Sequence, residues 1–172
     1  MYGLFIYEVK SGYFTNLKEV FDVLGDLAYE YNWLLSDYEC TCHPSDKIPF
    51  GNEYVWLSGD ELVSIVNKFE ISFIWGVVTA YAKDILMNEV LQYPLPLAEK
   101  LDDVKNLDIT TQNPLSDIEI VPFDSSFLFV IAKSEELIKK FSREYPQSTD
   151  LAAHNHRLRG VTRGRFPYHT HE

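Results

Sequence analysis

The stretch that most constrains the fold is Ile71–Lys83 (ISFIWGVVTAYAK), which is apolar at almost every position. Side chains of a strand point alternately to its two faces, so this run predicts a central strand that is covered on both faces of a sheet. Gly76 in its middle predicts a bulge or the close approach of another backbone. Trp75, like Trp33 in an earlier apolar run, is therefore expected in the core. The run is also shorter than the roughly 20 residues that cross a bilayer, so no membrane span is predicted.

Other patterns predict further elements around this strand. The predicted strands are Gly3–Val9, Tyr31–Tyr38, Glu53–Leu57, Asp117–Phe123 and Phe127–Ala132, with a loop over Cys40–Asn52. Pro122 is expected to push its strand toward a sheet edge. The predicted helices start at an Asn16 cap, at a Ser58/Glu61 capping box, at Asp84 and at a Ser134 cap. The first helix is expected to run to Tyr31.

The order of these elements predicts an α+β fold in a single domain. We expect a mainly antiparallel sheet of about five to six strands with about three to four helices packed on it. A chain of 172 residues suits one domain of this size. Its N-terminus has no basic region followed by a long apolar run, so a secretory signal is not expected.

Charge divides the chain into two parts of different composition. Residues 1–150 carry a net charge of −14, whereas residues 151–172 carry +3 and contain four of the five Arg and four of the five His. We therefore expect residues 1–150 to form the domain and 151–172 to lie outside it. The tail has two interpretations, a vector-derived extension or a native basic arm.

The acidic body indicates what kind of partner it can bind. Nucleic-acid affinity depends on Lys and Arg, so direct binding of DNA or RNA is disfavoured. A basic protein partner is electrostatically favoured. The alternative is that the acidic surface only keeps the protein soluble.

Several groups of residues have side chains that are typical of metal sites or of catalysis. Cys40, Cys42 and His43 are zinc-type ligands, but the other half of a tetrahedral site is missing, so two free thiols on a loop are the alternative. Glu8 and Lys10 have the spacing of some metal-dependent nuclease sites, and Asp37 with Glu39 could act in acid–base catalysis. The tail pairs His154/His156 and His169/His171 are candidates for metal binding. Neither a cofactor nor a metal is predicted.

The ends of the predicted strands Tyr31–Tyr38 and Glu53–Leu57 are better explained as a recognition surface. Aromatic anchors surrounded by carboxylates suit the Arg and Lys side chains of a basic partner. The predicted contact residues are Asp37, Tyr38, Glu39, Trp56, Asp60 and Glu61. Trp56 has a core position as its alternative.

Three stretches carry a resemblance to known proteins. Tyr31–Leu34 (YNWL), Trp56–Leu62 (WLSGDEL) and Phe73–Val77 (FIWGV) resemble small bacterial α+β proteins, some uncharacterised and some acting as immunity proteins in toxin–immunity pairs. The resemblance implies a cytoplasmic, non-catalytic protein that neutralises a basic toxin, such as a nuclease, by covering its surface. The alternative function is that of a small cytosolic enzyme.

Overall fold

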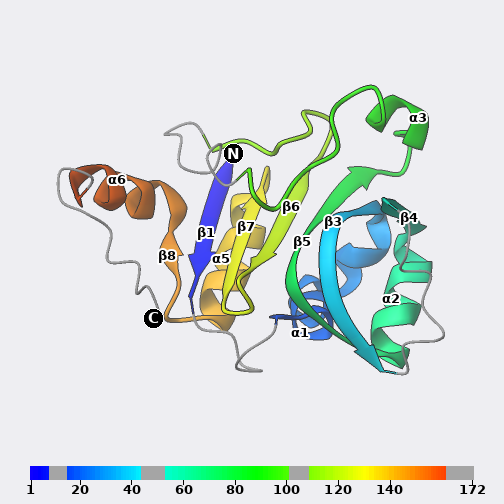
Figure 1. The fold of residues 1–172 in the computed structure, drawn as a ribbon, viewed down its shortest axis with the longest axis horizontal. Coiled ribbons are helices and arrows are strands. Elements are labelled where there is room, and N and C mark those ends of the chain that lie inside the picture. The colour runs from blue at the N-terminus through cyan, green and yellow to red at the C-terminus, as the bar shows by residue number, and fades with distance from the viewer. Residues whose placement is uncertain (8–14, 44–52, 101–108, 162–172) are drawn as a thin grey trace, which may run out of the picture.

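The computed structural model describes residues 1–7, 15–43, 53–100 and 109–161, with the backbone alone for 158–161. Within this part the chain forms one open antiparallel sheet of eight strands, five α-helices and one 3₁₀ helix (Figure 1). The predicted α+β class, single domain and antiparallel sheet are confirmed. The sheet has more strands than the five or six expected, because two strands of two residues each carry no sequence signal.

The strands follow the order β4-β3-β5-β6-β7-β1-β8, with β2 beside β5. Their bounds are β1 Tyr2–Ile6, β2 Thr15–Asn16, β3 Tyr31–His43, β4 Tyr54–Ser58, β5 Glu70–Ala82, β6 Ile118–Phe123, β7 Phe127–Ala132 and β8 Thr149–Asp150. β5 is central, as its apolar run predicted, and pairs with β3 along its whole length. On its other side β5 pairs first with β2, at Ser72 and Phe73, and then with β6, over Val78–Ala80.

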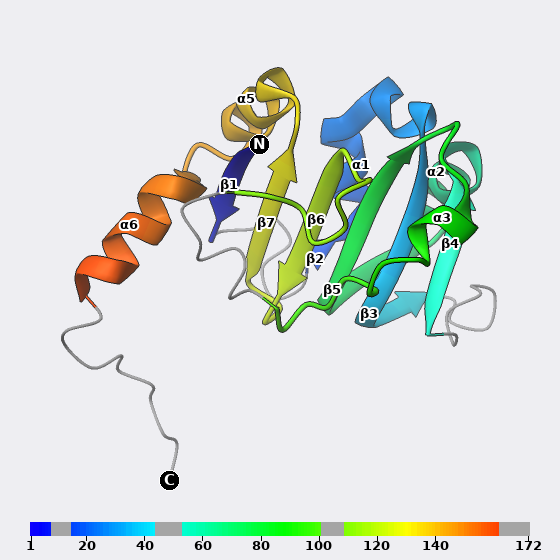
Figure 2. The same cartoon turned by 90° about the horizontal axis from the view of Figure 1, so that it is seen from above.

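One face of the sheet, called the helix face here, is covered by helices (Figure 2). They are α1 Leu17–Leu24, the 3₁₀ helix η1 Gly25–Glu30, α2 Gly59–Lys68 and α5 Glu135–Glu144. Their apolar side chains and the inward side chains of the strands form the largest buried cluster, which includes Trp33. This face therefore holds the main hydrophobic core.

Three helix starts are capped as the sequence predicted. Asn16 accepts the Lys18 N–H at 2.9 Å, and the Ser58 hydroxyl accepts the Glu61 N–H at 3.3 Å. Ser134 in the same way accepts the Leu137 N–H at 3.2 Å. The first helix is shorter than expected, because Gly25 at φ 61° ends α1 and the chain continues as η1.

The opposite face, called the loop face here, is crossed by residues 83–100 and 109–117, which we call the covering segment (Figures 1 and 2). It contains the short helix α3, Met87–Val90. A hydrogen bond joins this segment to the sheet, because the Ser36 hydroxyl of β3 donates to the Pro96 carbonyl at 2.7 Å. Asn113 within the segment donates to the Val90 carbonyl at 3.2 Å.

The interpretation of Cys40–Asn52 as a loop is wrong for its first four residues. β3 runs on to His43, because Cys40–His43 pair with Glu70–Phe73 of β5. Cys40 and Cys42 pack against the core of the helix face, two residues apart on one side of the strand. Residues 44–52 lie outside the described part of the chain.

Two further expectations about strands are wrong. β6 lies inside the sheet, between β5 and β7, and Pro122 is tolerated there because the pairing with β5 covers only Ile118–Ile120. Trp75 is not in the core, since 38% of its surface is exposed. The covering segment shields much of the loop face of β5 but leaves Trp75 open.

At the C-terminal side, β8 pairs with β1 and leads into α6, Leu151–Val161, which extends past this edge of the sheet (Figure 2). Leu151 is fully buried, and the His154 ring lies 4.1 Å from the Phe5 ring. The predicted boundary at residue 150 thus falls directly before a residue that packs on the sheet. His169 and His171 are outside the described residues, as are Glu8 and Lys10. Among the helices described, none combines the length and apolar character needed to cross a membrane.

Candidate functional site

The loop face is irregular where β3 passes Trp75. Ser36 lies opposite Val77 and Glu39 lies opposite Trp75, so β3 has one residue more than β5 between these pairs. Asp37 takes up this bulge with φ 44°, a left-handed conformation that aspartate tolerates better than most residues. Its carboxylate accepts the Ala98 N–H at 2.6 Å. The bulge therefore anchors the covering segment beside Trp75.

The direction of Trp75 follows from its neighbours. Tyr38 packs against the core of the helix face, so Glu39 and the Trp75 opposite it point to the loop face. A Cβ on Gly76 would lie 2.9 Å from the Cβ of Tyr38. Gly76 is thus approached by the side chains of Tyr38 and Phe73 and not by another backbone, while the irregularity expected as the alternative lies beside it in the pairing with β3. Only glycine leaves room for Tyr38 to pack this tightly.

The turn between β6 and β7 closes on Trp75 from the other side. Asp124 and Ser125 have φ 51° and 55°, and the Ser126 N–H donates to the Phe123 carbonyl at 3.3 Å. The Ser125 N–H donates to the Ile74 carbonyl of β5 at 2.9 Å, which holds the turn next to Trp75. This is the tight-turn geometry that twisted hairpins favour.

Backbone strain is concentrated around Trp75. Asp37, Asp124 and Ser125 are all the non-glycine residues with positive φ in the described part of the chain, and each flanks β5 at this point. Such conformations cost free energy and cluster at functional sites. The three residues therefore mark this part of the loop face as the candidate functional site.

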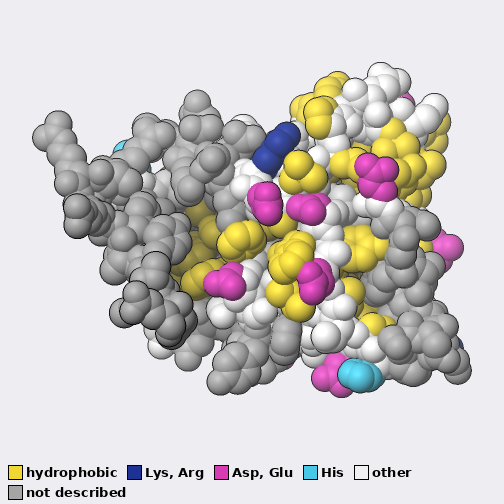
Figure 3. Space-filling model, viewed as in Figure 1, with side chains coloured by type: hydrophobic (Ala, Val, Ile, Leu, Met, Phe, Trp, Pro, Cys, Tyr) yellow, Lys and Arg dark blue, Asp and Glu magenta, His cyan; other side chains and the backbone are white. Residues whose placement is uncertain are grey.

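We define the Trp75 patch by Trp75 and the residues that these pairings and bonds bring next to it, which are Asp37, Glu39, Leu97 and Asp124. Trp75 and Leu97 are 38% and 39% exposed. The patch combines two large apolar side chains with three carboxylates and contains no Lys or Arg. Figure 3 shows the loop face, where yellow apolar side chains alternate with magenta acidic ones and, among the described residues, blue basic side chains are scarce.

The structure places four of the predicted contact residues on or near β3 and β4. Asp37 and Glu39 belong to the Trp75 patch, whereas Tyr38 is half-buried on the helix face. Trp56 is half-buried on the loop face, with its ring 5.4 Å from that of Tyr81. Trp56 therefore packs in part against a buried cluster, in the direction of its alternative as a core residue, and its role as a contact residue stays a prediction.

The other two predicted residues start α2. The Glu61 carboxylate accepts the Ser58 N–H at 2.8 Å, and this bond and the one from the Ser58 hydroxyl lower the pKa of Glu61. Asp60 is exposed and lies 3.9 Å from the Lys83 ammonium. Ser58 pairs with Asn32, seven residues along β3 from Glu39, a separation of roughly 20 Å. The six predicted residues do not form one patch.

Sequence reasoning missed Trp75, Leu97 and Asp124. The turn at Asp124 was recognised, but nothing in the sequence showed that it folds against Ile74. Trp75 was assigned to the core because its strand is apolar on both faces. Its exposure depends on the path of the covering segment, which has no regular pattern.

The cysteines are poorly suited to reactivity. Burial raises the pKa of the Cys40 thiol to about 11, with smaller contributions from Cys42 and Glu39. Burial also raises the pKa of Cys42. A thiol with a raised pKa is a weak nucleophile and metal ligand at neutral pH, because the thiolate is the reactive form. Within the described residues, no three His, Cys, Asp or Glu side chains are grouped to hold a metal ion.

Comparison of this chain with protein-family models, curated proteins and solved structures found no match. Its function is therefore inferred from the chemistry and geometry of its surfaces.

Proposed function

We propose that this protein is a non-catalytic binding protein that covers a basic protein partner with the Trp75 patch. The observation that carries the proposal is Trp75 itself, 38% exposed on a central strand, opposite Glu39 and between the bulge at Asp37 and the turn at Asp124. Tryptophan is among the residues most enriched at the energetic centres of interfaces.

The patch suits cationic side chains in two ways. The exposed indole face attracts an Arg or Lys placed over it, worth about 0.5–2 kcal/mol depending on how far the pair is desolvated. The carboxylates around it attract a basic surface from a distance and raise the association rate. A chain of net charge −11 adds to this attraction.

A toxin domain is the class of partner that we infer, with this protein acting in the cytoplasm as its immunity or inhibitor protein. A nuclease toxin presents Lys and Arg to the phosphates of its substrate. The same side chains would pair with Asp37, Glu39 and Asp124, so the patch would compete with nucleic acid for them. Inhibition then needs no chemistry from this protein.

The test is capture of the partner at low salt by the purified chain from an extract of the producing cells. We expect a basic protein that is released by about 0.5 M salt, where charges on the surface are strongly screened. Reversing two patch charges, Glu39→Lys with Asp124→Lys, should abolish capture. The matched control reverses two exposed charges of the helix face, Glu30→Lys with Glu136→Lys, and should keep it.

Two outcomes would reject the proposal. One is that no basic protein is captured at low salt. The other is that the patch reversal and the control reversal have the same effect, because total charge and not the patch would then explain the binding.

A further inference from the structure

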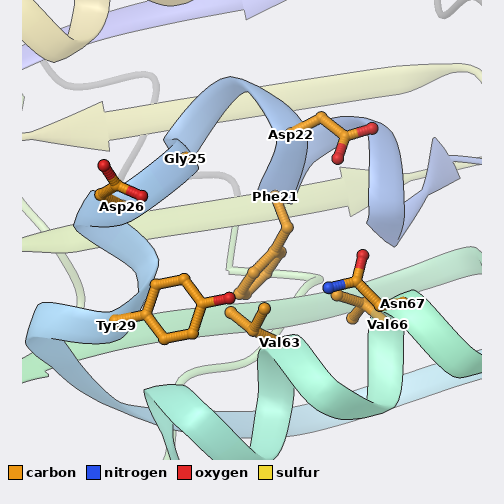
Figure 4. A pocket seen from close by; sticks show the side chains of 8 residues that line it. All are labelled: Phe21, Asp22, Gly25, Asp26, Tyr29, Val63, Val66 and Asn67. Atoms are coloured by element: carbon orange, nitrogen blue, oxygen red, sulfur yellow. The ribbon is translucent and has the colours of Figure 1, made fainter.

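A separate pocket of about 210 Å³ lies on the helix face, between α1, η1 and α2 (Figure 4). Its lining residues are Phe21, Asp22, Gly25, Asp26, Tyr29, Val63, Val66 and Asn67. We call it the α1–α2 pocket. None of these residues belongs to the predicted contact surface or to the Trp75 patch.

The pocket has an apolar floor and an acidic rim. Phe21, Val63 and Val66 are buried side chains of the main core, and they form the floor. In Figure 4, Asp22 of α1 and Asp26 of η1 lie well apart and point away from each other, and the Tyr29 ring lies beside Phe21 and Val63. The Tyr29 ring is 41% exposed, so one of its sides is open to an incoming group.

The two carboxylates remain available. Asp22 pairs with Lys18 at 2.5 Å, but both side chains are exposed, and such pairs contribute little free energy. Asp26 has no ion pair or hydrogen bond with the rest of the described chain. A cation in the pocket would thus gain partners without breaking a buried interaction.

The neighbouring groove on the other side of α1 already holds a cation of this chain. It is lined by Glu19, Asp22, Val23, Lys140 and Glu144. The Lys140 ammonium donates to the Leu24 carbonyl at 3.2 Å, at the C-terminal end of α1, where the helix dipole favours positive charge. This ammonium also lies 3.4 Å from the position of a Cβ built on Gly25, so Lys140 already neutralises the helix end. The α1–α2 pocket shares Asp22 with the groove, and no Lys or Arg is among its lining residues.

The size of the pocket limits its occupant. Pockets for drug-sized ligands are about 300–1,000 Å³, so about 210 Å³ suits a single long side chain rather than a cofactor. An apolar floor below an acidic rim matches a side chain with an aliphatic stem and a cationic head.

We propose that the α1–α2 pocket binds one arginine side chain of a protein partner. The methylene stem packs on Phe21, Val63 and Val66. The guanidinium stacks on Tyr29 and donates to the carboxylate of Asp26. Arginine is favoured over lysine because its planar fork can donate to both oxygens of one carboxylate and stack on a ring.

This site is independent of the proposed function. The sheet separates it from the Trp75 patch, so one compact partner cannot contact both. The pocket therefore defines a second interaction, and its test needs no knowledge of the partner at the Trp75 patch.

The test uses N-acetyl-arginine methylamide as the probe and the methyl NMR signals of Val63 and Val66 as the readout. A ligand this small is expected to bind with a dissociation constant on the order of 1–10 mM. The neutral analogue N-acetyl-citrulline methylamide has nearly the same shape, and we expect it to shift these signals at least tenfold less at equal concentration, since it lacks the charge.

A pair of variants completes the test. Asp26→Asn should weaken arginine binding about threefold to tenfold, whereas Glu30→Gln, which removes an exposed charge of η1 outside the pocket lining, should leave it within about twofold. Equal shifts with citrulline, equal effects of the two variants, or no shift at about 50 mM arginine probe would each overturn the proposal.

Discussion

The Trp75 patch and the α1–α2 pocket are both acidic and aromatic, but they rest on different supports. The patch is displayed by a strand bulge, a tight turn and a segment held by single hydrogen bonds such as Ala98 N–H to Asp37. The floor of the pocket belongs to the main core. Charge alone does not distinguish the two regions. We expect the patch to tolerate substitution and the pocket floor to resist it.

The largest expected effect is on the pocket floor. Phe21→Ala removes a ring that is 5% exposed and lies 4.9 Å from the Trp33 ring, so the free energy of unfolding should fall by about 3–5 kcal/mol. Urea denaturation measures this change. Trp75→Ala is the counterpart in the patch and should cost less than half as much, although tryptophan is the larger residue. Equal losses would contradict the contrast between the two regions.

The next effect concerns the support of the patch. Asp37→Ala leaves the Ala98 N–H without its acceptor and places alanine at φ 44°, so stability should fall by about 1–3 kcal/mol. Hydrogen exchange should speed up at Ala98 more than at core amides of β5. Asp37→Asn keeps an acceptor oxygen and tolerates the left-handed backbone, and it should retain most of the protection. If both variants exchange alike at Ala98, the bond does not hold the segment.

An effect of pH is expected near the acidic grooves of α1. Burial raises the pKa of Tyr145 to about 12, with help from Glu19, Glu144 and Asp22. Because the folded pKa lies above the unfolded value near 10, this tyrosine stabilises the fold fully below pH 10, and the contribution is lost as the pH rises toward 12. Burial also raises the pKa of Tyr81 to about 12, so ultraviolet titration of tyrosinate should show two late-ionising groups, one of which Tyr145→Phe removes. Ionisation of all described tyrosines at pH 10 would contradict this.

The smallest expected effect is on the quenching of Trp75 fluorescence by charged quenchers, which reports the local electric field. The part of the tryptophan fluorescence lost in Trp75→Phe should be quenched relatively more by caesium and less by iodide than free N-acetyltryptophanamide, because nearby carboxylates repel anions. Glu39→Gln with Asp124→Asn should raise iodide quenching by about twofold. Asp22→Asn with Asp26→Asn, on the opposite face, should not change it. A response to the second pair would mean that net charge, not local charge, sets the field.

Regular elements were predictable because their patterns are local. Side-chain periodicity identified the strands, and the caps at Asn16, Ser58 and Ser134 identified the helix starts. The extension of β3 to His43 was missed, because polar residues such as Thr41 alternate there with half-buried cysteines and resemble a loop.

The candidate site was predictable only in part. Asp37 and Glu39 were expected as contact residues, but their grouping with Trp75 depends on a bulge whose register is set by pairing across the sheet. The α1–α2 pocket was not predicted, because it arises from the packing of two helices that are far apart in the sequence. Periodicity marks Phe21, Val63 and Val66 as core but does not show that a pocket opens above them.

The most direct test of the central claim is the affinity of the captured basic partner for two single variants. Trp75→Ala should weaken binding by at least about 30-fold, the equivalent of a 2 kcal/mol contact at the centre of an interface. Tyr29→Ala, which removes the exposed ring of the α1–α2 pocket, should change the affinity less than about twofold, the size of a contact outside the interface. Wild-type affinity in Trp75→Ala, or a loss confined to Tyr29→Ala, would contradict the assignment of the partner to the Trp75 patch.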